Sequence, residues 1–168
     1  IPYLVKQGFE GPIYTTAATR DLCAYMLTDS AFIQEREVEY MQKKKKKCCP
    51  PLYTTEDAAN AMKQFIGMPY EKAFTVTDGV VASFYDAGHI LGSAITHFII
   101  HDKEKNTHTT LAYTGDLGRK NLPILRDPQP TPPAHYFITE ATYGNRLHAA
   151  FTDMKTQLAK MINKTAAR

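Results

Sequence analysis

The pattern of hydrophobic and polar positions changes character about halfway along the chain. In the first part, apolar residues recur at spacings of three and four, which is the period of a helix with one buried face. This pattern predicts a helix that begins near Arg20, capped by Thr19 or the residues just before it, and a second helical stretch over residues 29–41. The lysine run at residues 43–47 and the prolines after it end that stretch. A third helix is expected over residues 54–67, because hydroxyl and acidic residues suit its first turn.

The second part consists of short β-branched and aromatic runs of strand length. These runs are residues 73–76, 80–85, 94–100, 109–113 and 135–139, with one further short strand earlier, at residues 13–16. Residues 102–106 are polar and predict a hairpin loop. A proline-rich connector precedes the last strand, and residues 152–163 predict a closing amphipathic helix. The order predicts an α/β or α+β fold, with helices first and then a largely antiparallel sheet.

Composition places the chain among ordinary globular proteins. Its 168 residues are 43% hydrophobic and 22% charged, which is enough for one domain with a sizeable core. No stretch approaches the roughly 20 apolar residues that cross a bilayer, so no membrane partner is expected. The chain begins at Ile1 without an initiator Met or the features of a signal peptide, which predicts a start inside a longer polypeptide.

The charge pattern leaves two interpretations open. The formal net charge is only +3, and most of the excess lies in the lysine run at residues 43–47. Such a run can contact the phosphates of a polyanion. It can equally be a solvated helix end or loop, and this second interpretation is the simpler one, because no aromatic residue is interleaved with the lysines as a stacking platform requires.

The cysteines indicate a reducing compartment. Cys23, Cys48 and Cys49 are odd in number, and none of their spacings is CxxC. Adjacent cysteines rarely bridge each other, so no disulfide framework is expected and the cytoplasm is the predicted location. The same lack of spacing favours thiols with no role in metal binding.

Three segments that follow strands carry an unusual concentration of polar residues and glycines. They are residues 86–93 (DAGHILGS), 114–119 (TGDLGR) and 139–146 (TEATYGNR). Taken singly, each has an ordinary interpretation: His89 as a loop histidine, Asp116 as part of a turn, and Glu140 as a structural acid at a helix start. Together they place an imidazole and two carboxylates after successive strands, where a sheet edge can assemble a metal site.

These three segments, in this order, closely resemble the third and fourth motifs of the metallo-β-lactamase fold followed by the first β-CASP motif. Residues 8–22 and 29–35 also resemble bacterial members of this group. The lysine run and the pair Cys48 and Cys49 are not expected features of it. The resemblance implies an incomplete metallo-β-lactamase αββα sandwich, with a partial metallo-β-lactamase domain over residues 1–148 and the start of a β-CASP domain over residues 149–168.

The resemblance also implies roles for individual residues. His89 matches a ligand of the first zinc ion, and Asp116 matches the carboxylate that bridges two zinc ions. Glu140 matches an acid beside the metals that orients the site or handles protons, so Asp116 and Glu140 are the expected catalytic residues. Ser93 and Arg146 lie at positions suited to contact with a phosphate. Two zinc ions with a bridging hydroxide provide the chemistry for phosphodiester hydrolysis.

One departure from the family is large. The motif His-x-His-x-Asp-His, expected just before Ile1, does not occur in the chain, and neither do the later β-CASP histidine motifs. Because a zinc site uses at least three protein ligands, the chain by itself is expected to bind zinc weakly and to cleave nothing. A chain truncated in this way is also expected to expose apolar surface and to associate, for example as a homodimer.

The resulting functional prediction is a zinc-dependent ribonuclease as the longer protein, acting on RNA that is single-stranded. Two alternatives stay open at this point. One is a metallo-hydrolase of small esters or thioesters, against which the Glu140 motif argues. The other is a catalytically inactive scaffold subunit of an RNA-processing complex, against which the intact His89 and Asp116 argue.

Overall fold

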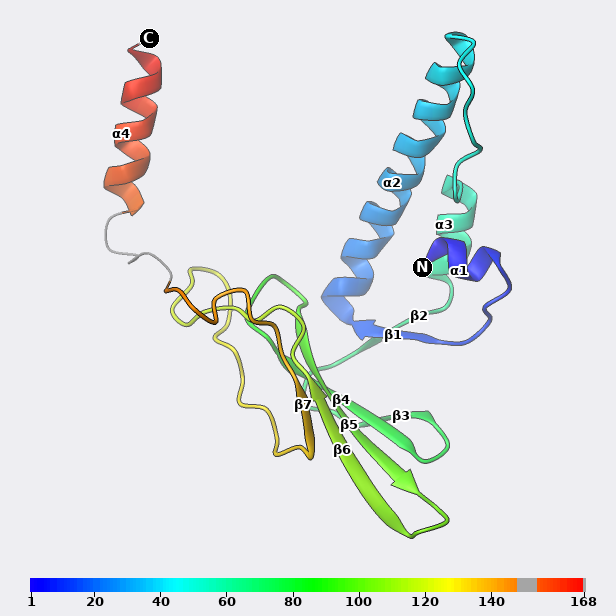
Figure 1. The fold of residues 1–168 in the computed structure, drawn as a ribbon, viewed down its shortest axis with the longest axis vertical. Coiled ribbons are helices and arrows are strands. Elements are labelled where there is room, and N and C mark those ends of the chain that lie inside the picture. Colours follow the sequence, from blue (N-terminus) through cyan, green and yellow to red (C-terminus); the bar gives the residue numbers. More distant parts are fainter. Residues whose placement is uncertain (148–153, 168) are drawn as a thin grey trace.

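The computed structural model describes residues 1–147 and 154–167, and these form the mixed α+β fold that the sequence predicts. In chain order the elements are α1 (Pro2–Lys6), β1 (Ile13–Thr16), α2 (Ala17–Lys43), α3 (Thr55–Met62), β2 (Phe65–Met68), β3 (Phe74–Thr77), β4 (Val80–Asp86), β5 (Ala94–Asp102), β6 (Thr107–Tyr113), β7 (Tyr136–Ile138) and α4 (Met154–Ala166) (Figure 1).

The longest element, α2, is one continuous helix of 27 residues. Its N-cap is Thr16, whose hydroxyl accepts a hydrogen bond from the backbone N–H of Thr19 at 3.2 Å. The helix therefore begins earlier than predicted, and the prediction of two separate helical stretches is wrong. No Gly or Pro interrupts it. Ser30, near the predicted break, accepts a hydrogen bond from the hydroxyl of Tyr53 at 3.0 Å, so its side chain binds a neighbouring loop instead of capping a helix.

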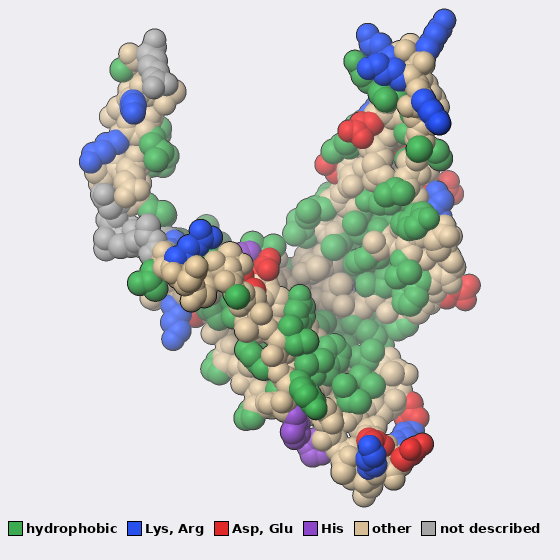
Figure 2. Space-filling model, viewed as in Figure 1, with side chains coloured by type: hydrophobic (Ala, Val, Ile, Leu, Met, Phe, Trp, Pro, Cys, Tyr) green, Lys and Arg blue, Asp and Glu red, His purple; other side chains and the backbone are tan. Residues whose placement is uncertain are grey.

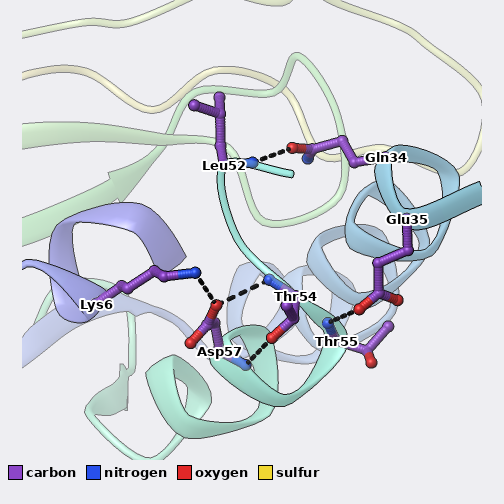
Figure 3. A network of polar contacts seen from close by, with 7 residues as sticks. All are labelled: Lys6, Gln34, Glu35, Leu52, Thr54, Thr55 and Asp57. Atoms are coloured by element: carbon purple, nitrogen blue, oxygen red, sulfur yellow. Dashed lines mark hydrogen bonds and ion pairs between the residues drawn. The ribbon is translucent and has the colours of Figure 1, made fainter. Parts of the chain in front are cut away.

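A polar network joins α1, α2 and α3 (Figure 3). The predicted cap of α3 is confirmed as a capping box: Thr54 Oγ1 accepts from the N–H of Asp57, and Asp57 Oδ2 accepts from the N–H of Thr54. Lys6 Nζ lies 2.8 Å from the same Oδ2. The hydrogen bond from Lys6, together with the one from the Thr54 backbone, holds the pKa of Asp57 below its usual value. Glu35 of α2 accepts from the N–H of Thr55 at 3.3 Å.

The end of α3 differs from the prediction. The helix stops at Met62, and the residues expected to continue it to Gly67 form β2, which pairs in parallel with β1. Ile13 of β1 lies opposite Phe65, and Phe65 is buried with 7% of its surface exposed. The partner strand precedes the long α2 helix, so the local pattern of residues 54–67 contains no sign of it.

The main sheet has five strands in the order β3-β4-β5-β6-β7. The first three pairs are antiparallel, and only β7 joins β6 in parallel, so the predicted largely antiparallel sheet is confirmed. The predicted hairpin loop between β5 and β6 is confirmed as well. The proline-rich connector crosses one face of the sheet: the carbonyl of Pro133 lies 3.4 Å from Nε2 of the buried His97, and the N–H of Gln129 donates to the carbonyl of Asp86 at 2.8 Å.

The core lies where the small parallel sheet meets the large one. Phe74, Ala82 and Phe84 are buried there, and the rings of Phe74 and Tyr14 lie 4.9 Å apart between centroids. On the helical side, α2 packs against β1, β2 and α3, and α1 packs against α3. This arrangement places the N-terminus of α2 beside the strand ends that the sequence marks as functional.

The last helix, α4, exposes every residue that the structure describes in it. The predicted start of this helix at Thr152, and the predicted domain boundary between residues 148 and 149, lie outside the described residues. Of the helices described, none has the length and apolar character that crossing a membrane requires.

Candidate active site

The loop after β4 positions His89 through its own hydrogen bonds. The carboxylate of Asp86 accepts from the N–H of Gly88 at 2.8 Å. The hydroxyl of Ser93 accepts from the N–H groups of His89 at 3.1 Å and Ile90 at 3.3 Å. The backbone is left-handed at Gly88, with φ of 63°, a conformation that glycine adopts without strain. The loop thus holds the imidazole of His89 at the surface, with 43% of the side chain exposed.

The same loop is anchored to the first turn of α2. The carbonyl of Gly92 accepts two hydrogen bonds, from Thr16 Oγ1 at 2.8 Å and from Thr19 Oγ1 at 2.9 Å. A β-carbon at Gly92 would lie 2.6 Å from Thr19 Oγ1, so only glycine allows this approach. The hydroxyl of Tyr70 donates to the carbonyl of Ser93 at 2.9 Å. The His89 loop is therefore fixed from three sides.

The loop after β6 brings Asp116 against the His89 loop. The N–H of Gly118 donates to the carbonyl of Ala87 at 2.8 Å, so the two loops are bonded through their backbones. As a result, Oδ2 of Asp116 lies 3.9 Å from Nε2 of His89. The side chain of Asp116 is 74% exposed, and no side chain or backbone group of the described residues donates a hydrogen bond to it, so its oxygens are accessible to a ligand.

Glu140 follows β7 and binds the Asp116 loop. Its Oε1 accepts from the backbone N–H of Leu117 at 2.6 Å. The hydrogen bond from Thr142 lowers the pKa of Glu140 most, followed by the Leu117 N–H and the nearby charge of His89, while partial burial opposes them. The carboxylate is therefore held in its ionised form, in which it accepts hydrogen bonds from both neighbours.

These three side chains line one open cavity of about 370 Å³. Asp116 and Glu140 reach it from the parallel neighbours β6 and β7, and His89 reaches it from the loop after β4. Arg119, Thr142 and Tyr143 also line it. The structure therefore brings together the imidazole and the two carboxylates that the sequence singled out, at one edge of the sheet.

The two predicted phosphate-contact residues lie outside this cavity's lining. The hydroxyl of Ser93 is occupied as an acceptor inside the His89 loop. The guanidinium carbon of Arg146 lies 4.8 Å from the ring centroid of Tyr143, which does line the cavity. Arg146 thus lies against a residue of the cavity lining, whereas Ser93 supports the His89 loop from within it. Their phosphate roles stay predictions.

His89 and Asp116 supply part of the donor set that zinc requires. An imidazole nitrogen and a carboxylate oxygen are ordinary zinc ligands, and two ligands of one tetrahedral zinc ion lie roughly 3.3 Å apart. The observed 3.9 Å between His89 and Asp116 needs only a small closure to match. Over residues 1–147 and 154–167, however, no group of three or more His, Cys, Asp or Glu side chains is placed to hold a metal ion. The pair fits part of a zinc site, and further ligands are needed to complete one.

Sequence reasoning missed the residues that hold the site together. Gly118 and Thr19 were not among the predicted site residues, although one joins the two loops and the other anchors the His89 loop to α2. The only sequence signal for Gly118 is a second glycine close after Asp116. For Thr19 the signal was a position near a helix N-terminus, which predicted a cap and not a contact with a distant loop.

Comparison with known proteins adds independent information. No protein-family model matches the chain. The chain is 33% identical over 172 residues to "Transcription termination factor FttA" of Methanosarcina mazei, covering all of this chain and 25% of that protein. It is 27% identical over 168 residues to "Ribonuclease TTHA0252" of Thermus thermophilus, covering all of this chain and 34% of that protein. It is 32% identical over 174 residues to the FttA protein of Thermococcus kodakarensis, covering all of this chain and 24% of that protein.

The mixed fold, the sheet-edge site and these similarities are consistent with a partial metallo-β-lactamase fold. The chain is similar over its whole length to β-CASP proteins of that fold, and the resemblance inferred from its three motifs is confirmed. The chain spans about a quarter to a third of the length of the curated relatives it matches.

Proposed function

We propose that the longer protein of which this chain forms part is a zinc-dependent ribonuclease that acts on single-stranded RNA. The observation that carries the proposal is the shared cavity of His89, Asp116 and Glu140. The similarity to a protein named a ribonuclease supports the substrate class. The three free thiols support the cytoplasm as the compartment.

In this proposal, His89 and Asp116 hold the metal, with further ligands from outside this chain. Bound zinc supplies a Lewis acid and an activated water for attack on a phosphodiester. Glu140 acts mainly by position, because its carboxylate holds the N–H of Leu117 and thereby fixes the backbone next to Asp116. Arg146, which lies against the cavity-lining Tyr143, would meet a phosphate of the substrate.

The chain by itself is proposed to bind zinc weakly and to lack turnover, since it offers the metal two donors close together. We further propose that residues 1–148 belong to the metallo-β-lactamase domain and residues 149–168 to the start of the β-CASP domain. Stoichiometric zinc in the purified 168-residue chain, or RNA cleavage by it, would contradict this part of the proposal.

The experiment uses the longer protein, with zinc content and RNA cleavage measured on the same preparations. His89→Ala is expected to lower zinc content, and Asp116→Asn is expected to reduce cleavage by at least about a thousandfold, because an activated water is lost. The control is His101→Ala, which removes an exposed histidine of β5 far along the strand from the site. Full cleavage in both site variants would overturn the proposal.

A second candidate is a role in transcription termination, favoured by the similarity to proteins of that name. A catalytically inactive subunit of an RNA-processing complex falls under this second candidate, because it too would act without cleaving RNA. The same two variants distinguish nuclease activity from a role in termination. If His89→Ala and Asp116→Asn leave termination intact in a transcription assay, the protein acts there without cleavage.

A further inference from the structure

The far end of α2 carries a cluster of cationic side chains. We call the segment from Lys43 to Lys47 the lysine tip. All five lysines are exposed, and Figure 2 shows Lys and Arg side chains gathered at this end of the helix. None of the five forms an ion pair within residues 1–147 and 154–167. The tip therefore presents unneutralised positive charge to solvent.

This charge is local. The whole chain has a formal net charge of +3, so without these five lysines it would carry −2. A surface that is mildly acidic elsewhere and strongly basic at one point binds a polyanion through that point. The lysine tip is therefore the part of the chain that a phosphate backbone would meet first.

The tip is also structured. The N–H of Lys44 donates to the carbonyl of Tyr40 at 3.1 Å, the N–H of Lys45 to Gln42 at 2.9 Å, and the N–H of Lys46 to Met41 at 3.0 Å. These bonds close the last turn of α2. The lysines are thus displayed on a closed helix end, which lowers the ordering cost of binding compared with a free tail.

An aromatic ring lies beside the lysines, which the sequence alone did not reveal. Tyr40 is one helical turn before Lys44, so the two side chains share a face of α2. Lys44 Nζ lies 5.8 Å from the ring centroid of Tyr40, and 59% of Tyr40 is exposed. An exposed ring next to several cations is the combination that binds single-stranded nucleic acids, with a base on the ring and phosphates on the cations.

We propose that the lysine tip and Tyr40 form a binding site for single-stranded RNA that is separate from the candidate active site. The identity of RNA as the ligand rests on the proposed function. The helix α2 has 27 residues, which at 1.5 Å per residue gives a length of about 40 Å. Its other end is bonded through Thr16 to the loop that carries His89. The tip thus stands on the order of 40 Å from that loop, and only an RNA long enough to span this distance engages both.

The test is fluorescence anisotropy with the 168-residue chain and a labelled oligouridylate of about 30 nucleotides. The variant Lys43→Gln/Lys45→Gln/Lys46→Gln is expected to bind at least about tenfold more weakly at low salt. The slope of its log affinity against log salt concentration should be shallower by about 2, because three phosphate contacts are lost and each contributes roughly 0.7 in a single strand. The matched control, Lys155→Gln/Lys160→Gln/Lys164→Gln, removes the same charge from exposed positions of α4 and should change affinity by less than twofold.

Tyr40→Leu tests the ring at constant charge. It is expected to weaken binding roughly fivefold or more, because the stacking of a base on the ring is lost. The salt slope should stay unchanged, because every phosphate contact is kept. Circular dichroism shows whether the helix content of each variant is that of the wild type. Equal losses in the tip and α4 variants, or an unchanged salt slope in the tip variant, would overturn the proposal, as would binding of anionic vesicles but not of RNA.

RNA length gives a second readout, in the longer protein. The tip variant should raise KM for the 30-nucleotide RNA about tenfold and leave KM for a six-nucleotide RNA unchanged, since the short RNA cannot span the distance. Equal effects on both lengths would overturn the separation of the two sites. The binding assay needs neither metal nor turnover. If the proposed nuclease function is wrong, the tip variant still binds RNA more weakly than the control; if the lysine tip is not an RNA site, the two variants bind alike.

Discussion

A β-carbon placed on Gly118 would fall 1.7 Å from the carbonyl oxygen of Gly88. It would also lie 2.6 Å from the backbone nitrogen of His89. The loops that carry Asp116 and His89 are therefore in direct backbone contact, and the missing side chain of Gly118 is what permits it. The distance between the two candidate metal ligands depends on this contact.

Gly118→Ala is therefore expected to push the two loops apart and to lower zinc affinity and RNA cleavage of the longer protein at least about tenfold, because misplacement of a ligand by about an ångström is costly. Zinc content and initial cleavage rates measure the effect. The control is Gly11→Ala, for which the three atoms nearest the new β-carbon all belong to the movable ring of Phe9. A Gly118→Ala protein with normal zinc content and cleavage would show that the loop contact does not set the site.

The two hydroxyl bonds to Gly92 should contribute to stability. Thr19→Val removes one of them and is expected to lower the free energy of unfolding of the 168-residue chain by about 1 kcal/mol. Thr16→Val also removes the cap of α2 and should cost about 1–2 kcal/mol or more. Urea denaturation followed by circular dichroism measures both. Thr28→Val, which removes an exposed hydroxyl within α2, should change stability little, and an equal loss in that control would refute the special role of the Gly92 contact.

The capping box of α3 should make stability depend on pH. The pKa of Asp57 is lowered in the folded state by Lys6 and by the Thr54 backbone. Its stabilising effect is therefore complete above the unfolded pKa of about 3.9 and is lost as the pH falls through the lower, folded value. The thermal unfolding midpoint should fall with acid in this range more steeply for the wild type than for Asp57→Asn. Asp29→Asn serves as the control, and identical pH profiles for wild type and Asp57→Asn would contradict the prediction.

The edge strand β7 should drive association of the 168-residue chain. Among the residues that the structure describes it pairs only with β6, and its residues Tyr136, Phe137 and Ile138 are 63%, 56% and 52% exposed. An exposed apolar edge strand is a template for pairing with another chain. Sedimentation velocity should show concentration-dependent dimers or larger species, reduced by Phe137→Lys. Ile124→Lys, which adds the same charge at a fully exposed position of the connector, should leave association unchanged. A monomer at all concentrations would refute the prediction.

The sequence determined those features that depend on neighbouring residues. Strands β4, β5 and β6 were predicted from runs of β-branched and aromatic residues, and the start of α3 was predicted from Thr54 and Asp57. The three polar segments could also be placed at strand ends, which brought His89, Asp116 and Glu140 to one edge of the sheet. Strand propensity and helix capping are local properties, so a local pattern was sufficient for them.

Tertiary structure alone decided how these segments meet. Residues 65–68 became a strand because β1 supplied a partner across the length of α2, and α2 is continuous although two separate helical stretches were predicted. The bond from Leu117 to Glu140, like the approach of Gly118 to Gly88, joins residues far apart in the chain. Such contacts follow from the summed packing of many elements, and no short stretch of sequence contains the partner that completes them.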